Sequence, residues 1–223
     1  MAASNKKDKL RGVSKAHIRY KLADGKVVPG ATTITGLLNK PQLVRWANKL
    51  GLEGIDSSKY TDEAAAVGTL AHAMVQAHLV GEKVDYSLFS PVQVELAENS
   101  LLSFFEWYGR HDIEPIICEV PMVSEEYKYG GTVDCYCMMD GVPTLLDFKT
   151  GKAIYPEYFV QTSAYRQLLC ERGCKVERVQ ILRIGRDETE GFEERAITDT
   201  TKYFKIFTNL LEVYYLQKSL GWN

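Results

Sequence analysis

The chain has 223 residues, a formal net charge of −2 and 45% hydrophobic residues, a composition typical of a globular protein. This length suits one large domain, and no shift in composition marks a second one. No apolar run of about eighteen residues occurs, so no membrane span is predicted, and the small net charge excludes a general polyanion binder.

The N-terminal stretch is the most basic part of the sequence. Between residues 6 and 21 it holds one acid and seven basic residues, which are Lys6, Lys7, Lys9, Arg11, Lys15, Arg19 and Lys21. We expect residues 1–24 to form a flexible basic arm that either contacts nucleic acid or stays solvated. The stretch lacks the apolar segment of a secretory signal. Five cysteines without a framework spacing are typical of a reducing compartment, so we expect a cytoplasmic protein.

The part after the arm has mostly helical patterns. Residues 27–38 (VVPGATTITGLL) favour an extended piece that runs into a turn. Three helices are then expected, over 41–50, 61–80 and 91–109. Gly51 should end the first of these helices, and Thr61 should cap the second, which Gly81 follows. Ser90 should open the third.

From about residue 111 the apolar pattern changes to the two-residue period of strands. Asp140 and Gly141 signal a tight hairpin, and the chain should close with an amphipathic helix over 199–218. The other elements are expected as strands over 113–123, 129–139, 143–150, 176–185 and 191–198 and a helix over 156–171. This mixture predicts an α/β fold in which helices flank a central mixed sheet.

The stretch LLDFKTGK, residues 145–152, puts an acid and a base on one face of a predicted strand, because side chains two apart share a face. A two-residue turn would set Asp134 opposite Asp147, and Thr132 opposite Lys149. Two facing carboxylates repel each other. A divalent cation such as Mg²⁺ or Mn²⁺ removes that repulsion and can generate hydroxide beside a phosphoryl oxygen. The alternative is a surface pair of Asp147 and Lys149 without function.

Four short motifs follow one another along the chain: Gly68-Thr-Leu-Ala-His72, Gly131-Thr-Val-Asp134, Asp147-Phe-Lys149 and Gln161-Thr-Ser-Ala-Tyr165. In this order and on these elements they resemble the motifs of the PD-(D/E)XK nuclease superfamily, specifically its RecB-like exonuclease branch. Asp147 stands where Glu is commoner. Residues 31–51 also resemble the N-terminal region of phage exonucleases and of mitochondrial genome maintenance exonucleases.

The resemblance implies a single nuclease domain with a restriction-endonuclease-like core. The core would cover residues 111–223, and residues 25–110 would form an N-terminal helical elaboration that carries the first motif. Those helices are expected to build a wall or arch over the site. An arch of this kind would admit one strand of DNA and favour attack from free ends.

The resemblance also implies the roles of the motif residues. Asp134, Asp147, His72 and the backbone carbonyl of Phe148 would bind one or two Mg²⁺ or Mn²⁺ ions, and Lys149 would activate the attacking water. By itself, His72 is more naturally a structural helix residue. The products would carry a 5′-phosphate and a 3′-hydroxyl.

Further residues have weaker signals. Glu119 is either an extra metal ligand or a salt-bridge partner. Gln161 and Tyr165 share a helix face, and they are expected, with Thr132, to contact substrate phosphates or hold the catalytic lysine. Arg45 and its neighbour Trp46 could clamp or stack on a strand end, although Trp46 fits a core position better. Gly68 within a helix indicates either a close approach or ordinary packing.

The expected activity is therefore a metal-dependent DNA exonuclease of phage type that acts on single-stranded DNA or free ends in replication, recombination or repair. A single-strand-annealing or replication protein is a candidate partner, and the setting would be a bacterial or phage-infected cell. The alternatives are a structure-specific endonuclease, a non-catalytic DNA-binding accessory protein and a small-molecule metal hydrolase. Some RecB-like nucleases bind an iron–sulfur cluster through one cysteine ahead of the motif histidine and three near the C-terminus. No cysteine precedes Cys118 in this chain, so no iron–sulfur cluster is expected.

Overall fold

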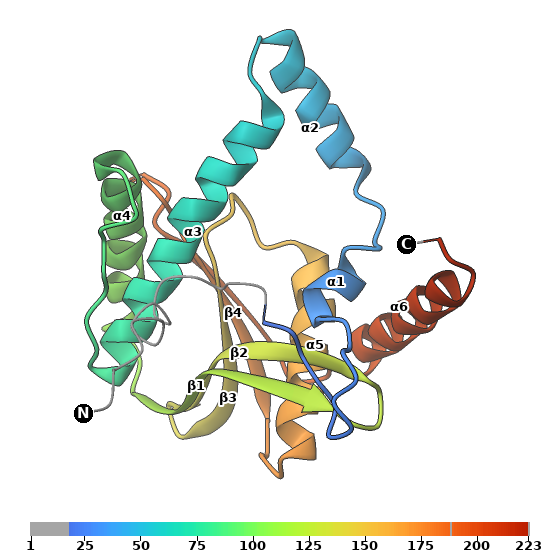
Figure 1. The fold of residues 1–223 in the computed structure, drawn as a ribbon. Helices are drawn as coiled ribbons and strands as arrows, with labels where there is room; N and C mark the ends of the chain where they lie inside the picture. Colours follow the sequence, from blue (N-terminus) through green and yellow to red (C-terminus); the bar gives the residue numbers. More distant parts are fainter. Residues whose placement is uncertain (1–17, 188, 223) are drawn as a thin grey trace, which may run out of the picture.

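Five strands form one mixed sheet in the order β1-β2-β3-β4-β5 (Figure 1). The computed structural model describes residues 18–187 and 189–222, so most of the expected basic arm lies outside the described residues. The strands are β1 (Ile113–Ser124), β2 (Tyr129–Met139), β3 (Val142–Lys149), β4 (Arg178–Ile184) and β5 (Phe192–Ile197). β3 and β4 are parallel, and the other neighbours are antiparallel.

Helices cover both faces of this sheet (Figure 1). They are α1 (Ala31–Thr35), α2 (Pro41–Leu52), α3 (Ser57–Val80), α4 (Pro91–Tyr108), α5 (Pro156–Glu171) and α6 (Thr201–Ser219). On one face, α1, α5 and α6 bury residues such as Ile34, Ala164 and Phe207 in one core cluster. On the other, α3 and α4 bury Val75 and Phe104 in a second cluster. The predicted α/β fold, in which helices flank a central mixed sheet, is thus confirmed.

Three predictions in the N-terminal half were wrong, one in the type of element and two in the boundaries of a helix. The segment ATTIT forms α1 rather than extended chain, because burial of Ala31 and Ile34 outweighs the strand preference of its β-branched residues. α2 runs through Gly51 to Leu52. α3 begins at Ser57, four residues before Thr61.

The early start of α3 has a simple cause. Asp56 is its N-cap, and its Oδ1 accepts hydrogen bonds from the backbone N–H groups of Ser58 (2.8 Å) and Lys59 (3.2 Å). The remaining helix signals behaved as expected: Gly81 ends α3 in the left-handed conformation, and Ser90 caps α4 in a capping box with Gln93. Among the described helices none is long and apolar enough to cross a membrane.

The β2–β3 hairpin has the predicted turn and register. Asp140 and Gly141 have positive φ values of 54° and 75°, as a two-residue type I′ turn requires. Cross-strand pairs run from Met139 with Val142 back to Cys135 with Leu146, which is the last pair of this ladder in the described chain. The predicted pairings of Asp134 with Asp147 and of Thr132 with Lys149 were wrong, because both lie beyond the last pair of this ladder.

The β1–β2 ladder is also interrupted at this level. Cys118 pairs with Cys135 and Val120 with Val133, but Glu119 and Asp134 between them are not ladder partners. Val133 packs into the cluster under α5, whereas Cys135 packs into the cluster under α3 and α4. Residues two apart in a regular strand share one face, so β2 turns at Asp134.

A close approach explains the first residue of the Gly131–Asp134 motif. A Cβ at Gly131 would lie 2.5 Å from Cε1 and 2.8 Å from Cδ1 of the Tyr165 ring. Tyr165 is a buried residue of α5. No side chain fits between β2 and this ring. The glycine therefore sets how closely α5 lies on the sheet.

We expect Gly131→Ala to lower the free energy of unfolding by about 1–3 kcal/mol, because the buried ring has no room to move. The matched control is Gly51→Ala in α2, where a Cβ would meet nothing within 4 Å. That change should raise the free energy of unfolding by about 0.5–1 kcal/mol, the usual gain for Gly to Ala within a helix. Urea denaturation measures both. If Gly131→Ala had the same free energy of unfolding as the wild type, the Tyr165 ring would have to move to accommodate the extra methyl group.

Candidate active site

Three potential ligand side chains converge where β1 and β2 lose their regular pairing. His72 of α3, Glu119 of β1 and Asp134 of β2 each offer one ligand atom, and these atoms all lie within 4.8 Å of one another. The structure thus places together three of the residues that the sequence suggested. Glu119, for which two roles were left open, belongs to this group.

Glu119 has a strained backbone. Its φ is +52°, a left-handed value that costs an L-residue other than Asn or Asp roughly 1–2 kcal/mol. The strain coincides with the break in the ladder opposite Asp134. Sequence analysis could not find this feature, since nothing in the residue types around Glu119 predicts a left-handed conformation.

Asp134 is the central acid of the group, and it is only 6% exposed. Its Oδ2 accepts a hydrogen bond of 3.0 Å from the backbone N–H of Phe148 and lies 3.6 Å from Nδ1 of His72. The side chain thus takes the place of a ladder carbonyl at the end of β3. In an extended strand the N–H and C=O of one residue point to the same side, so the Phe148 carbonyl is also directed toward β2.

Asp147 and Lys149 form an ion pair at the end of β3. Lys149 Nζ lies 2.6 Å from Oδ2 of Asp147, which is 1% exposed. The ammonium group also lies 5.1 Å from the ring centre of Tyr158 in α5. Burial raises the pKa of Tyr158 to about 12, so this ring stays neutral and presents its face to the cation. Nothing in the Asp147-Phe-Lys149 motif predicts that Tyr158 orders the Lys149 side chain.

Gln161 and Tyr165 lie next to the two aspartates, as their place in the last motif suggested. Gln161 Nε2 donates a 2.6 Å hydrogen bond to the Tyr165 hydroxyl oxygen. The pKa of Tyr165 is raised well above its ordinary value, first by burial and then by the negative charges of Asp147 and Asp134. Both carboxylates therefore act on this phenol, which remains protonated and keeps a hydrogen to donate.

Thr132 lies at the margin of the site. Its Oγ1 is 3.0 Å from the hydroxyl oxygen of Tyr20, a residue that sequence analysis did not single out. Tyr20 also fills the space above Gly130, where a Cβ would come within 2.5 Å of its ring. Tyr20 belongs to the segment that was expected to be a flexible arm, but here it packs onto β2 beside the site.

α3 is positioned by its glycine. A Cβ at Gly68 would lie 2.7 Å from Oγ1 of Thr150, so the loop after β3 packs directly against the helix. This is the packing role that sequence analysis left open for Gly68. One turn later, His72 meets the Phe148 ring edge-on, with ring centres 6.1 Å apart. The contact orients the imidazole toward Asp134.

Arg45 and Trp46 are not part of this cluster. Both are on α2, which stands clear of the sheet in Figure 1, and Arg45 is exposed. The expectation that Trp46 belongs to the core was wrong: it is half-buried and packs edge-to-face on Tyr60 of α3, with ring centres 5.6 Å apart. The pair joins α2 to α3.

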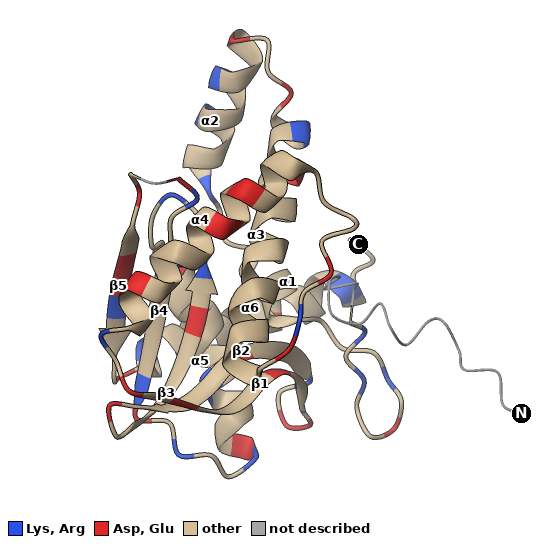
Figure 2. Cartoon of the chain, turned by 90° about the vertical axis from the view of Figure 1, so that its left-hand side faces the viewer, with Lys and Arg blue, Asp and Glu red and all other residues tan. Residues whose placement is uncertain are grey.

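The donor set fits a divalent cation. Carboxylate oxygens suit Mg²⁺ and Mn²⁺, and an imidazole is a further ligand for first-row transition metals. Glu119, Asp134 and His72 would hold the ion, with Asp147 and the Phe148 carbonyl next to them. Along the described part of the chain, Lys and Arg are interspersed with Asp and Glu (Figure 2).

Comparison with known proteins does not assign this chain to a family. No protein-family model matches the chain. A probable glycine dehydrogenase (decarboxylating) subunit 1 from Geobacillus sp. (strain WCH70) is 25% identical over 185 residues, covering 76% of this chain but 39% of that protein. The chain thus spans about two fifths of the curated relative that it matches. Identity and coverage this low transfer no activity to this chain.

Two kinds of solved structure are similar in outline. A putative exonuclease from Eubacterium rectale aligns with a TM-score of 0.44 and 16% identity, over 70% of this chain and 68% of that chain. The alkaline exonuclease LHK-Exo from Laribacter hongkongensis, whose structures include a complex with dAMP, aligns with a TM-score of 0.35 and 15% identity, over 68% and 83% of the two chains. TM-scores this low carry no argument about function, which must come from the site itself.

The strain at Glu119 can be separated from its charge by two substitutions. Glu119→Gly should raise the free energy of unfolding in EDTA by about 1 kcal/mol, since glycine adopts a positive φ without strain. Glu119→Gln should keep the strain. Both should weaken Mn²⁺ binding by at least about tenfold, as loss of a metal-site residue does. Urea denaturation and titration with Mn²⁺ followed by electron paramagnetic resonance measure the two effects.

The control is Lys128→Gly at the β1–β2 turn, where φ is +60°. It should gain similar stability without any change in Mn²⁺ affinity. Unchanged Mn²⁺ affinity in both Glu119 variants would remove Glu119 from the ligand set.

Proposed function

We propose that the chain is a metal-dependent DNA exonuclease that hydrolyses phosphodiester bonds from free ends of single-stranded DNA. The observation that carries the proposal is the meeting of two groups at one break in the sheet. One group is His72, Glu119 and Asp134, and the other is the ion pair of Asp147 and Lys149. An acidic cluster beside an ordered lysine is the arrangement that phosphodiester hydrolysis requires.

In this proposal, His72, Glu119 and Asp134 hold the metal, with Asp147 and the Phe148 carbonyl completing the ligand set. When bound, Mg²⁺ or Mn²⁺ lowers the pKa of a coordinated water and offsets the charge on the phosphoryl oxygens. The acids of this chain are fixed before substrate arrives, because Asp134 is hydrogen-bonded to the backbone of β3. Fixed ligands need no reorganisation during the reaction.

Lys149 then acts on the water and the phosphate. Its pairing with Asp147 and its position over Tyr158 restrict the ammonium group to the end of β3. From there it orients the attacking water and donates to the oxygen on which charge develops. Tyr165, held by Gln161, keeps a phenol proton beside both aspartates. Thr132 and Gln161 are the further polar groups that we assign to substrate phosphates.

The projection of α2 and the first turns of α3 beyond the sheet supports a preference for one strand (Figure 1). The contact between Gly68 and Thr150 sets α3 beside the end of β3, where Lys149 lies. In this proposal the projecting helices narrow the approach to Lys149, which favours a free end over an internal site in a duplex. A role in replication, recombination or repair in a phage or its host is the setting that the motif resemblance implies.

Lys149→Ala should abolish cleavage of single-stranded DNA and leave binding of the same DNA within about twofold of the wild type, because the lysine acts on the water and on developing charge. Cleavage of an end-labelled oligonucleotide and fluorescence anisotropy in EDTA measure the two properties. The control is Lys205→Ala on the outer side of α6. Full activity of Lys149→Ala would reject the proposed mechanism.

The requirement for a free end is tested with linear and circular single strands of one sequence, incubated with Mg²⁺, Mn²⁺ or EDTA. We expect loss of the linear strand alone, and only with a metal, since a projection that admits ends excludes circles. The position of the label gives the polarity. Cleavage of the circle would favour the endonuclease alternative, and binding without any cleavage would favour the accessory protein.

A further inference from the structure

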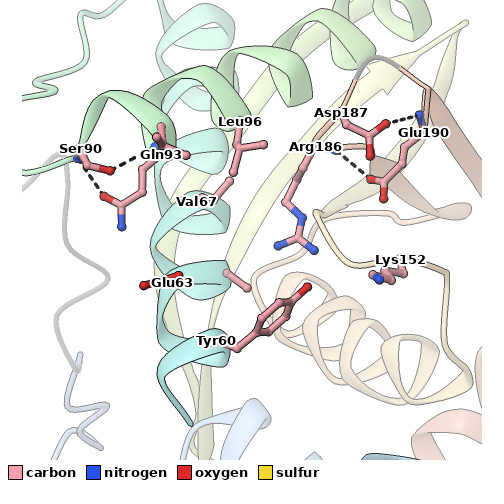
Figure 3. A pocket seen from close by; sticks show the side chains of 12 residues that line it. Tyr60, Glu63, Val67, Ser90, Gln93, Leu96, Lys152, Arg186, Asp187 and Glu190 are labelled. Carbon is pink, nitrogen blue, oxygen red and sulfur yellow. Dashed lines mark hydrogen bonds between the residues drawn. The ribbon is translucent and has the colours of Figure 1, made fainter. Parts of the chain in front are cut away.

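A groove of about 520 Å³ lies next to the candidate active site and is not used by the chemistry described above. It is bounded by α3, α4, the β4–β5 turn and the loop after β3 (Figure 3). Tyr60 and Val67 of α3 line one wall. Lys152 of the loop and Arg186 of the turn line the other.

Two cations face this groove. Figure 3 shows the guanidinium of Arg186 directed into the hollow between Tyr60 and Lys152. The backbone of Arg186 is fixed at both ends: Asn99 Nδ2 donates to its carbonyl (3.4 Å), and its own N–H donates to Glu190 Oε2 (2.9 Å). Within residues 18–187 and 189–222, neither Arg186 nor Lys152 forms an ion pair with a carboxylate.

Two of the three acids that line the groove, Asp187 and Glu190, accept hydrogen bonds from the backbone of their own turn. Asp187 Oδ1 accepts hydrogen bonds from the N–H and the hydroxyl of Thr189 and from the N–H of Glu190, which lower the pKa of Asp187. Glu190 Oε2 accepts from the backbone of Arg186. Glu63 points away from Arg186 in Figure 3. Asp187 and Glu190 therefore stabilise the backbone of the turn, and the Arg186 side chain extends into the groove.

Tyr60 supplies a flat surface in the same groove. Its side chain is 38% exposed, and Trp46 of α2 packs edge-to-face on it with an interplanar angle of 67°. This contact restricts the ring and leaves part of it open. An exposed, fixed aromatic ring beside unpaired cations is the usual combination for binding single-stranded nucleic acid.

The groove shares two elements of the chain with the candidate active site. Val67 directly precedes Gly68 on α3. His72 lies five positions after Val67, a rise of about 7.5 Å along the helix. Lys152 follows Lys149 by three residues in the loop after β3. Each wall of the groove therefore belongs to a segment that also carries a residue of the site, His72 on α3 and Lys149 just before the loop.

We propose that this groove holds the single-stranded stretch beside the bond that is cut, with Arg186 and Lys152 binding phosphodiester groups and Tyr60 stacking on a base. The inference rests on the proposed function and adds a second contact region to it. Stacking and backbone contacts are tolerant of sequence, so the groove recognises a flexible strand rather than particular bases. A duplex would offer no free base face to Tyr60.

The test measures binding of a labelled oligothymidylate of about 20 nucleotides, longer than one site of this kind, in EDTA so that no strand is cut. Arg186→Gln and Lys152→Gln should each raise Kd about tenfold and lower the slope of log K against log salt by about 0.7, the value for one lost phosphate contact. Tyr60→Leu should raise Kd about tenfold, and Tyr60→Phe should restore the binding that Tyr60→Leu loses.

Two matched controls lie outside the groove. Arg195→Gln on β5 removes an arginine that pairs with Glu193, and Lys175→Gln removes a lysine that pairs with Glu177. Surface pairs of this kind contribute little, so both should bind like the wild type. Circular dichroism and thermal melting confirm folding of every variant.

The outcomes separate this inference from the proposed function. Wild-type protein that binds and degrades the strand, with unchanged Kd and salt slope in Arg186→Gln and Lys152→Gln, overturns the groove and leaves the nuclease proposal intact. Equal losses in Tyr60→Leu and Tyr60→Phe overturn the stacking. Wild-type protein that neither binds nor degrades the strand rejects the proposed function, and the inference fails with it.

Discussion

The hydrogen bond from the Phe148 N–H to Asp134 Oδ2 is the contact on which the site depends. It replaces the next ladder bond between β2 and β3, so the two strands separate at the point where both acids lie. Had the ladder continued, Asp134 and Asp147 would have faced each other as a repulsive pair. Instead one acid turns toward His72 and Glu119, and the other turns toward Lys149. The hydrogen bond between Phe148 and Asp134 thus positions both acids of the candidate active site at the end of β3.

Burial makes this arrangement costly and explains its partners. Asp134 and Asp147 are 6% and 1% exposed, and buried carboxylates are unfavourable unless they are paired or coordinate a metal. Lys149 compensates Asp147 directly, whereas Asp134 has a backbone N–H and an imidazole nearby. The left-handed Glu119 brings a further acid to this group at the expense of backbone strain. Such strain persists only where surrounding structure enforces it, and here β2 and α3 do so.

The sequence predicted the parts of this site that depend on local spacing. The hairpin register follows from the turn at Asp140, and the four motifs lie on the expected elements because their spacing matches strand and helix periods. Tertiary effects escaped prediction. The start of α1 depends on burial of Ile34, and Trp46 leaves the core because α2 projects from the body. The conformation of Glu119 and the ring of Tyr158 under Lys149 arise from packing between distant segments, for which a single sequence carries no signal.

The charge of the molecule limits how it can hold a polyanion. With a net charge of −2 and both signs mixed over the surface, long-range attraction is weak, and charges beyond about 8–10 Å are screened at physiological salt. Affinity must therefore come from short contacts within walled regions. The groove between α3 and the β4–β5 turn offers such contacts, because Asp187 and Glu190 are bonded to the backbone of their own turn, while Arg186 and Lys152 form no ion pair with a carboxylate of the described residues. Lys152 follows Lys149 by three residues, so in the proposed binding mode the contacts that hold the strand also place it close to the catalytic lysine.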